Sequence, residues 1–127
     1  MINESYVSFE TANLLKEKGF DVSCYGRYSV RSKEFHLDTT KPCNNGGISQ
    51  YSAPTQQMAM AWLREIHSLS VEVYRTACGY IGCIVNIPFG TDLKFLEETG
   101  DDLASGQYTT WEGACEAAIQ YCLEKLI

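Results

Sequence analysis

The stretch PTQQMAMAWLREIHSLSVEVYRTACGYIGCIVNI, from Pro54 to Ile87, decides the fold, because a helical pattern gives way within it to a β pattern. Pro54 has a fixed φ and no N–H group to lose, so it suits the first turn of a helix. One apolar stripe with a 3.6-residue period follows, formed by Met58, Ala59, Trp62, Ile66 and Leu69. We therefore predict an amphipathic helix over residues 54–67.

The period changes from 3.6 to 2 at Ser70 and predicts a β-hairpin. Residues 71–76 alternate between two faces, and Gly79 supplies the positive φ that a short turn requires. The second strand, Tyr80–Ile87, is apolar on much of both faces, which indicates a central strand. Pro88 cannot donate a ladder hydrogen bond, so we expect the strand to end before it.

Upstream of this stretch we predict a helix and a second hairpin. Ser8 suits the N-cap of a helix over 9–18, and Gly19 suits the position after its end. Aromatic and β-branched residues then predict strands near 25–30 and 34–37. The segment Thr39–Ala53 is rich in Asn, Gly and Ser and is expected to be an exposed loop, tethered by Ile48 and Tyr51. It suits a functional loop and a connector equally well.

The chain ends in its clearest helix. Thr110 is the expected N-cap, with Thr109 as the alternative, and Trp111 is the expected anchor. The small Ala and Cys residues of its apolar stripe suit close packing on a sheet. The stripe comprises Ala114, Cys115, Ala118, Ile119, Cys122, Leu123 and Leu126. Glu112, Glu116, Gln120, Glu124 and Lys125 are assigned to the solvent side. Before this helix, residues 92–99 suit either a short strand or one to two helical turns.

Length and composition predict one globular domain spanning residues 1–127. We predict the α+β class: a small, mostly antiparallel sheet of about four strands, with about three helices packed on one face. No run of eighteen apolar residues is present, and the first residues lack the pattern of a signal peptide. A cytoplasmic location is therefore expected.

Six cysteines are present, and neither disulfides nor a metal site is expected from them. A cytoplasmic chain keeps its thiols reduced, and the close ligand pairs of zinc sites are missing. Buried thiols behave as small apolar groups, which is the preferred interpretation. The zinc alternative would combine Cys43, Cys78, Cys83 and His36. A calcium alternative would use an acidic group without the spacing of a calcium loop, namely Asp92, Glu97, Glu98, Asp101 and Asp102.

Charge and motifs also limit the function. The net charge of −6 opposes non-specific binding to nucleic acid. The carboxylates of Glu34 and Asp38 also reduce the local positive charge of the basic group Arg27, Arg31, Lys33 and Lys41. The sequence contains no nucleotide-binding fingerprint and no zinc-protease helix. A Cys–His pair would need His36 or His67 close to a thiol. We therefore expect no enzyme activity and no cofactor, and a small thiol or metal enzyme is the weakest alternative.

Tyrosines supply the candidate interaction surface, because Tyr is enriched at binding hot spots. The candidate residues are Tyr25, Tyr28, Tyr51, Tyr74 and Tyr80. Tyrosine is also an ordinary half-buried residue, and the pattern alone does not separate these two roles.

Three segments together resemble a family of small uncharacterised proteins encoded by phages and prophages of gut anaerobic bacteria. They are SFETANLLKEKGF (8–20), APTQ through WLRE (53–65) and YTTWEGACEAA (108–118). The last segment departs from the family at Trp111, where Tyr is usual, and at Gly113, where an acidic residue is usual. The resemblance implies a phage or prophage origin, a bacterial host cytoplasm and a shared fold, but no activity.

Two functions follow as hypotheses. The first is a non-catalytic accessory protein that contacts an unidentified host or phage protein, without direct nucleic-acid or membrane binding. The alternative is an acidic inhibitor that occupies a nucleic-acid-binding host protein, and it is motivated by the net charge.

Overall fold

A computed structural model of the chain describes residues 4–77, 79–90, 92–96 and 108–127. These residues form an α+β fold, which confirms the predicted class. The elements are α1 (Phe9–Glu17), β1 (Gly26–Ser29), β2 (Phe35–Leu37), β3 (Gln50–Ser52), α2 (Gln56–Ile66), β4 (Leu69–Arg75), β5 (Tyr80–Asn86), β6 (Asp92–Leu96) and α3 (Trp111–Tyr121). A π-helical turn, Cys122–Leu126, continues α3.

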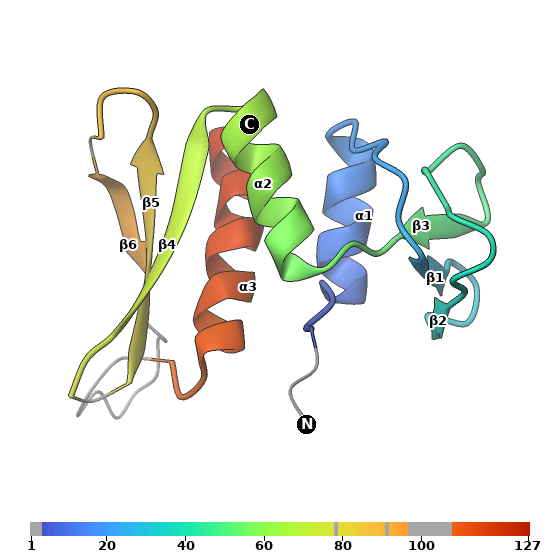
Figure 1. The fold of residues 1–127 in the computed structure, drawn as a ribbon, viewed down its shortest axis with the longest axis horizontal. Helices are drawn as coiled ribbons and strands as arrows, with labels where there is room; N and C mark the ends of the chain where they lie inside the picture. The colour runs from blue at the N-terminus through green and yellow to red at the C-terminus, as the bar shows by residue number, and fades with distance from the viewer. Residues whose placement is uncertain (1–3, 78, 91, 97–107) are drawn as a thin grey trace.

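The strands form two antiparallel sheets, with the orders β2-β1-β3 and β4-β5-β6, and the helices lie between them (Figure 1). Helix α3 packs on β4 and β5 and α2 packs on β4, while α1 packs against α3 and β3. The sequence predicted one sheet of about four strands. The sequence predicted the strands near 25–30 and 34–37 and the hairpin over 71–87, but it placed β3 in a loop and left residues 92–99 open. Alternation also does not specify which strands pair across long stretches of chain.

The predicted helix starts are confirmed at two of three positions. The Ser8 hydroxyl accepts a hydrogen bond from Thr11 N, and Thr110 does the same for Gly113 N, at 3.2 and 3.0 Å. The prediction for Pro54 was wrong, because Thr55 is the N-cap of α2 and Pro54 precedes it. The carbonyl of Pro54 accepts a hydrogen bond from the backbone of the N-terminal segment instead.

The buried face of α2 differs from the predicted stripe. Met60 and Leu63 are buried with Ala59 and Trp62, whereas Ile66 is 64% exposed. The helix packs on α3 and β4. The Trp62 ring also meets the ring of Phe20, which follows α1, at 5.4 Å between centroids. A helix with neighbours on two sides buries more than one stripe. A single apolar stripe in the sequence therefore gives the wrong limits for the buried face of the helix.

The second sheet matches the predicted hairpin. Strand β4 pairs with β5 from Leu69↔Asn86 to Arg75↔Tyr80, and β5 is the central strand as predicted. Residues 92–96 form a strand, which decides between the two alternatives. A Cβ at Gly82 would lie 3.0 Å from Ala114 O and 3.3 Å from Ala118 Cβ. The small residues of α3 therefore do allow close packing on β5.

The segment Thr39–Ala53 is more ordered than the predicted loop, since it contains β3 and ends in the fully buried Ala53. Asn45 holds the segment in place: its Nδ2 donates to Phe20 O at 2.8 Å, and its Oδ1 accepts from Ser52 N at 2.7 Å. The prediction that Ile48 tethers the segment was wrong, because Ile48 is 94% exposed.

Candidate functional site

Tyr28 and Tyr51 are neighbours that connect the first sheet to α1. They are paired residues of β1 and β3, and both rings contact Phe9, at 5.7 and 5.4 Å between centroids. The Tyr28 hydroxyl donates to Val7 O at 2.7 Å. Burial, followed by the nearby Glu116 and Glu10 carboxylates, raises the pKa of Tyr28. These two tyrosines contribute mainly to packing.

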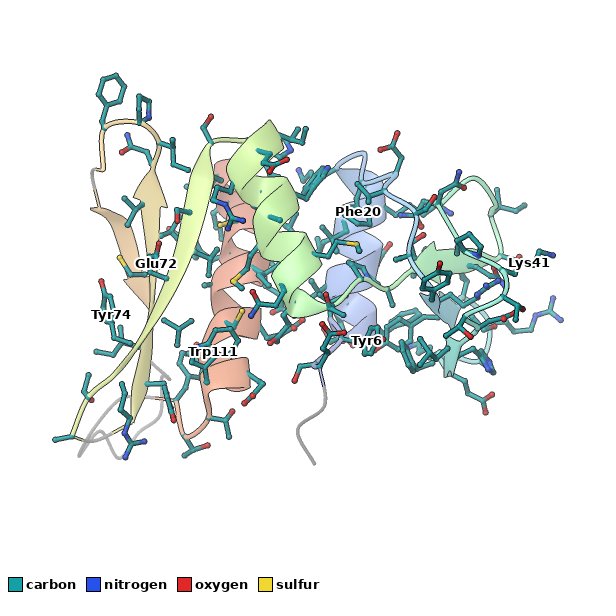
Figure 2. The ribbon with its side chains drawn as sticks, in the orientation of Figure 1. Tyr6, Phe20, Lys41, Glu72, Tyr74 and Trp111 are labelled. Carbon is teal, nitrogen blue, oxygen red and sulfur yellow. The ribbon has the colours of Figure 1, made fainter. Side chains whose placement is uncertain are left out.

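The other candidate tyrosines lie elsewhere. Tyr25 precedes β1 and is 49% exposed. Tyr74 and Tyr80 belong to β4 and β5, where Tyr74 is 44% exposed and the Arg75 guanidinium lies 5.0 Å from the Tyr80 ring centroid. Figure 2 shows Tyr74 at one end of the molecule, while Tyr6 lies toward the first sheet. The structure therefore divides the five tyrosines between two sheets.

One strand of the first sheet leaves an edge unpaired among the described residues. Strand β2 is at the edge of its sheet, and Phe35, His36 and Leu37 are all exposed. Backbone bonds from Ser29 N to Glu34 O and from Asp38 N to Tyr25 O fix the ladder. The alternation of an antiparallel ladder then turns the backbone N–H and C=O groups of Phe35 and Leu37 away from β1. We call Phe35–Leu37 the β2 edge.

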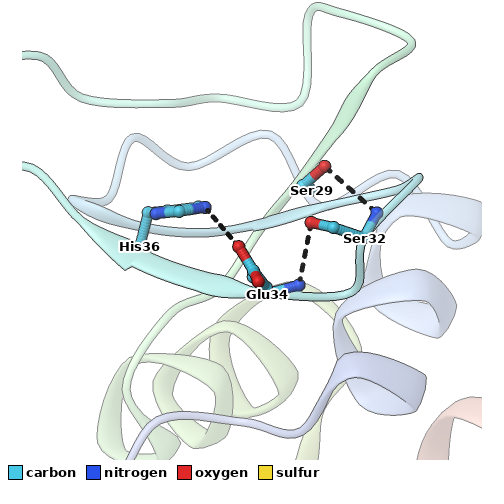
Figure 3. Close-up of polar contacts among 4 residues, drawn as sticks. All are labelled: Ser29, Ser32, Glu34 and His36. Carbon is cyan, nitrogen blue, oxygen red and sulfur yellow. Dashed lines mark hydrogen bonds and ion pairs between the residues drawn. The ribbon is translucent and has the colours of Figure 1, made fainter.

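The turn that leads into the β2 edge is held by its own side chains (Figure 3). Ser32 N donates to Ser29 Oγ at 3.5 Å, and Glu34 N donates to Ser32 Oγ at 3.4 Å. His36 Nε2 lies 3.9 Å from Glu34 Oε2, and both side chains are exposed. Such local contacts from Ser favour a defined turn, so the edge is presented by an ordered hairpin.

The first sheet and the rest of the chain differ in charge. Segment 26–52 carries four cations, Arg27, Arg31, Lys33 and Lys41, against two carboxylates, Glu34 and Asp38, which gives +2. The whole chain has a net charge of −6, so the remainder carries −8. The region around the β2 edge is therefore the basic part of an acidic protein.

A polar cluster at the crossing of the three helices was missed by the sequence analysis. The Glu116 carboxylate accepts from Ser8 N and Gln56 Nε2 at 3.0 Å each, and from the Thr11 hydroxyl. Gln120 Nε2 donates to Thr11 Oγ1 at 3.0 Å. Glu116 and Gln120 were wrongly assigned to the solvent side. Both residues border the apolar stripe of α3. They are covered by α1, whose position relative to α3 cannot be known from the pattern of α3 alone.

A pocket of about 240 Å³ lies between the starts of α2 and α3. Its described lining is Glu4, Ser5, Thr55, Gln56, Gln57, Trp111 and Glu112, which includes no histidine, cysteine or lysine. The Oε1 atom of Gln56 is buried and finds no hydrogen-bond partner among the described residues. The pocket offers hydrogen-bonding groups and an aromatic ring, without a nucleophile activated by an adjacent base.

The metal alternatives gain no support from the described residues, in which no three His, Cys, Asp or Glu side chains lie close enough to hold an ion. Cys83 is in β5, whereas His36 is in β2. Cys43 forms an isolated backbone β-bridge with Cys24 beside the sheet that contains β2. Cys78 lies outside the described residues, as do Glu97, Glu98, Asp101 and Asp102 of the calcium alternative.

The two histidines lie in different surroundings. His36 is exposed on β2, and the His67 ring packs against Trp62 at 4.7 Å between centroids. Burial raises the pKa of the Cys115 and Cys122 thiols to about 12, which keeps these two thiols protonated at neutral pH.

Among the described residues, no helix is both long and apolar enough to cross a bilayer. Comparisons with protein-family models, with curated proteins and with solved structures found no match to this chain. The function must therefore be argued from the surface of the molecule itself.

Proposed function

We propose that the chain is a non-catalytic accessory protein of phage or prophage origin, which acts in the bacterial host cytoplasm by contacting a host or phage protein. The observation that carries the proposal is the β2 edge, where unpaired backbone groups lie beside exposed apolar side chains. Leu37 is 52% exposed, and Phe35, two residues before it in the strand, is 37% exposed. Unpaired edges of this kind recruit extended segments from partner proteins.

The proposed occupant of the β2 edge is an extended, acidic segment of the partner. Its backbone would pair with the outward N–H and C=O groups of Phe35 and Leu37. The net charge of +2 over segment 26–52 favours an acidic segment and disfavours a basic one. Apolar side chains of the segment would cover Leu37 and Phe35. No catalytic step, cofactor, nucleic acid or membrane is part of this function.

The test compares two single substitutions. Leu37→Pro removes an outward N–H group and keeps the ladder to β1, because proline is tolerated at a free edge. Ile48→Ser removes an exposed apolar side chain elsewhere and is the matched control. A partner captured from bacterial lysate by the wild-type chain is identified, purified and titrated against all three proteins. We expect Leu37→Pro to weaken binding about tenfold or more, and Ile48→Ser to leave it unchanged.

Equal affinity of the partner for wild type and Leu37→Pro would contradict the use of the β2 edge. Turnover on a broad substrate panel that one substitution abolishes would contradict the non-catalytic role.

The alternative, an acidic inhibitor of a nucleic-acid-binding host protein, is favoured by one observation: the net charge of −8 outside segment 26–52. Such binding would be steered by charge and would weaken steeply with salt. Binding through the β2 edge adds backbone hydrogen bonds and apolar contact, so it should persist at high salt. The salt dependence of the captured partner therefore separates the two functions.

A further inference from the structure

Two cysteines lie directly opposite each other beside the first sheet. Cys24 and Cys43 form an isolated antiparallel bridge, with Cys24 N donating to Cys43 O at 3.0 Å and Cys43 N donating to Cys24 O at 2.7 Å. A pair that exchanges both hydrogen bonds has its Cα atoms about 5.5 Å apart. Disulfides usually join residues whose Cα atoms are about 4.4–6.8 Å apart, so the backbone already has a suitable spacing.

The sulfur atom of Cys24 also lies close to Cys43. Cys24 Sγ donates to Cys43 O at 3.8 Å and to Gly26 O at 3.6 Å, while Cys43 Sγ accepts from the Ser52 hydroxyl at 3.3 Å. Side chains that lie opposite each other on paired strands point to the same face. The bridge geometry and the contact of Cys24 Sγ with Cys43 O are separate observations, and both place the two side chains near each other.

We propose that Cys24 and Cys43 form a redox-active dithiol, which takes up an intramolecular disulfide by exchange with a low-molecular-weight disulfide such as oxidised glutathione. The site does not depend on the proposed partner. Cys83, Cys115 and Cys122 are fully buried and take no part in it.

Accessibility sets the order of the two exchange steps. Cys43 is half-buried and Cys24 is buried, so the Cys43 thiolate attacks the external disulfide first. An S–S bond forms between Cys43 and one glutathione, and the other glutathione leaves as a thiol. The Cys24 thiolate then attacks Cys43 Sγ and releases the second glutathione thiol. Two electrons pass from the protein to the reagent, and the protons of the two cysteines end on the two released thiols.

The disulfide would form a covalent loop that encloses residues 25–42, which contain β1, β2 and the turn between them. It would join the two ends of this hairpin beside the β2 edge. Reversible oxidation would therefore change how firmly the hairpin is held, without altering the fold around it. A disulfide that forms and is reduced again under mild conditions is typical of exposed or regulatory pairs.

The experiment treats the reduced, full-length protein with oxidised glutathione, blocks the remaining thiols with N-ethylmaleimide and digests with trypsin. The expected product has lost two hydrogens and contains the peptide 19–27 linked to the peptide 34–64, each of which carries one cysteine. Dithiothreitol should restore the starting mass. A linkage between other cysteines, or no linkage at all, would overturn the proposal.

Two variants test the order of attack. Cys24→Ser should retain a glutathione on Cys43, because no second thiol can displace it. Cys43→Ser should take up no glutathione, since Cys24 is buried. Circular dichroism checks that each variant is folded. If a variant does not fold, the linked peptides of the wild-type protein decide the question alone. A wild-type protein that keeps glutathione on Cys43 would overturn the proposal.

Discussion

The two sheets of this protein are held in different ways. The sheet β4-β5-β6 pairs β4 with β5 over seven residues of each strand and packs on α2 and α3 through small or aliphatic residues such as Gly82 and Ile84. The sheet β2-β1-β3 has shorter strands and depends on a few aromatic contacts to Phe9 and Tyr6. Tight packing over a wide area supports global stability, whereas a few contacts support a region that can open by itself.

The largest effect is expected from a cavity in the second sheet. Ile84 in β5 is fully buried, so Ile84→Ala should lower the free energy of unfolding by about 3 kcal/mol. Ile48→Ala removes the same atoms from an exposed position and should change it by less than about 0.5 kcal/mol. Urea unfolding of both variants measures the difference. Similar losses for both would contradict the assignment of the core.

The next effect comes from overpacking where β5 meets α3. Gly82→Ala adds a Cβ that would lie 3.0 Å from Ala114 O, and we expect it to destabilise the fold by about 1–3 kcal/mol. Gly47→Ala is the control, because nothing lies within 4 Å of a Cβ there. Thermal unfolding followed by circular dichroism compares the two variants. A higher melting temperature for Gly82→Ala would show that α3 can move away freely.

A smaller effect is expected from the polar cluster that joins α1 to α2 and α3. Glu116→Gln keeps the size of the side chain but replaces an acceptor oxygen with an amide donor that faces other donors. We expect a loss of about 1–2 kcal/mol in the free energy of unfolding. Glu124→Gln makes the same change at an exposed position. Urea unfolding should separate the pair, and equal stabilities would mean that the cluster contributes no net stability.

The smallest effect is expected in the first sheet. Tyr28→Phe removes the hydroxyl group that donates to Val7 O at 2.7 Å, at a cost of about 0.5–1.5 kcal/mol. Hydrogen exchange should then be faster in β1 and β3 than in β4 and β5, since the first sheet can open locally. Tyr25→Phe serves as the control. Equal acceleration in both sheets would indicate that they unfold as one unit.

Local sequence signals predicted local structure well. Ser8 and Thr110 cap helices because their hydroxyl groups satisfy backbone donors a few residues away, and Gly19 adopts the expected positive φ of 91°. The apolar character of both faces of β5 correctly indicated a central strand. These features depend on neighbours within a few residues, so the sequence pattern is sufficient to place them.

The misplaced features depend on distant parts of the chain. Ile66 fits the apolar stripe of α2, yet no described neighbour covers it, and it is exposed. Glu116 was assigned to solvent because its partners Ser8 and Thr11 lie more than a hundred residues away in the chain. The division of the tyrosines between two sheets follows from strand pairing in the same way. The pattern identifies which residues are apolar or polar, but not which elements cover them.

The contacts between α1 and α3 also bear on how the protein is made. Ser8 and Thr11 are synthesised more than a hundred residues before their partner Glu116. The aromatic contacts of the first sheet join residues between Tyr6 and Tyr51, so they are available much earlier. Long-range contacts form late in folding. A nascent chain should therefore assemble the first sheet before α3 is synthesised, and form the contacts between α1 and α3 only once Glu116 has emerged.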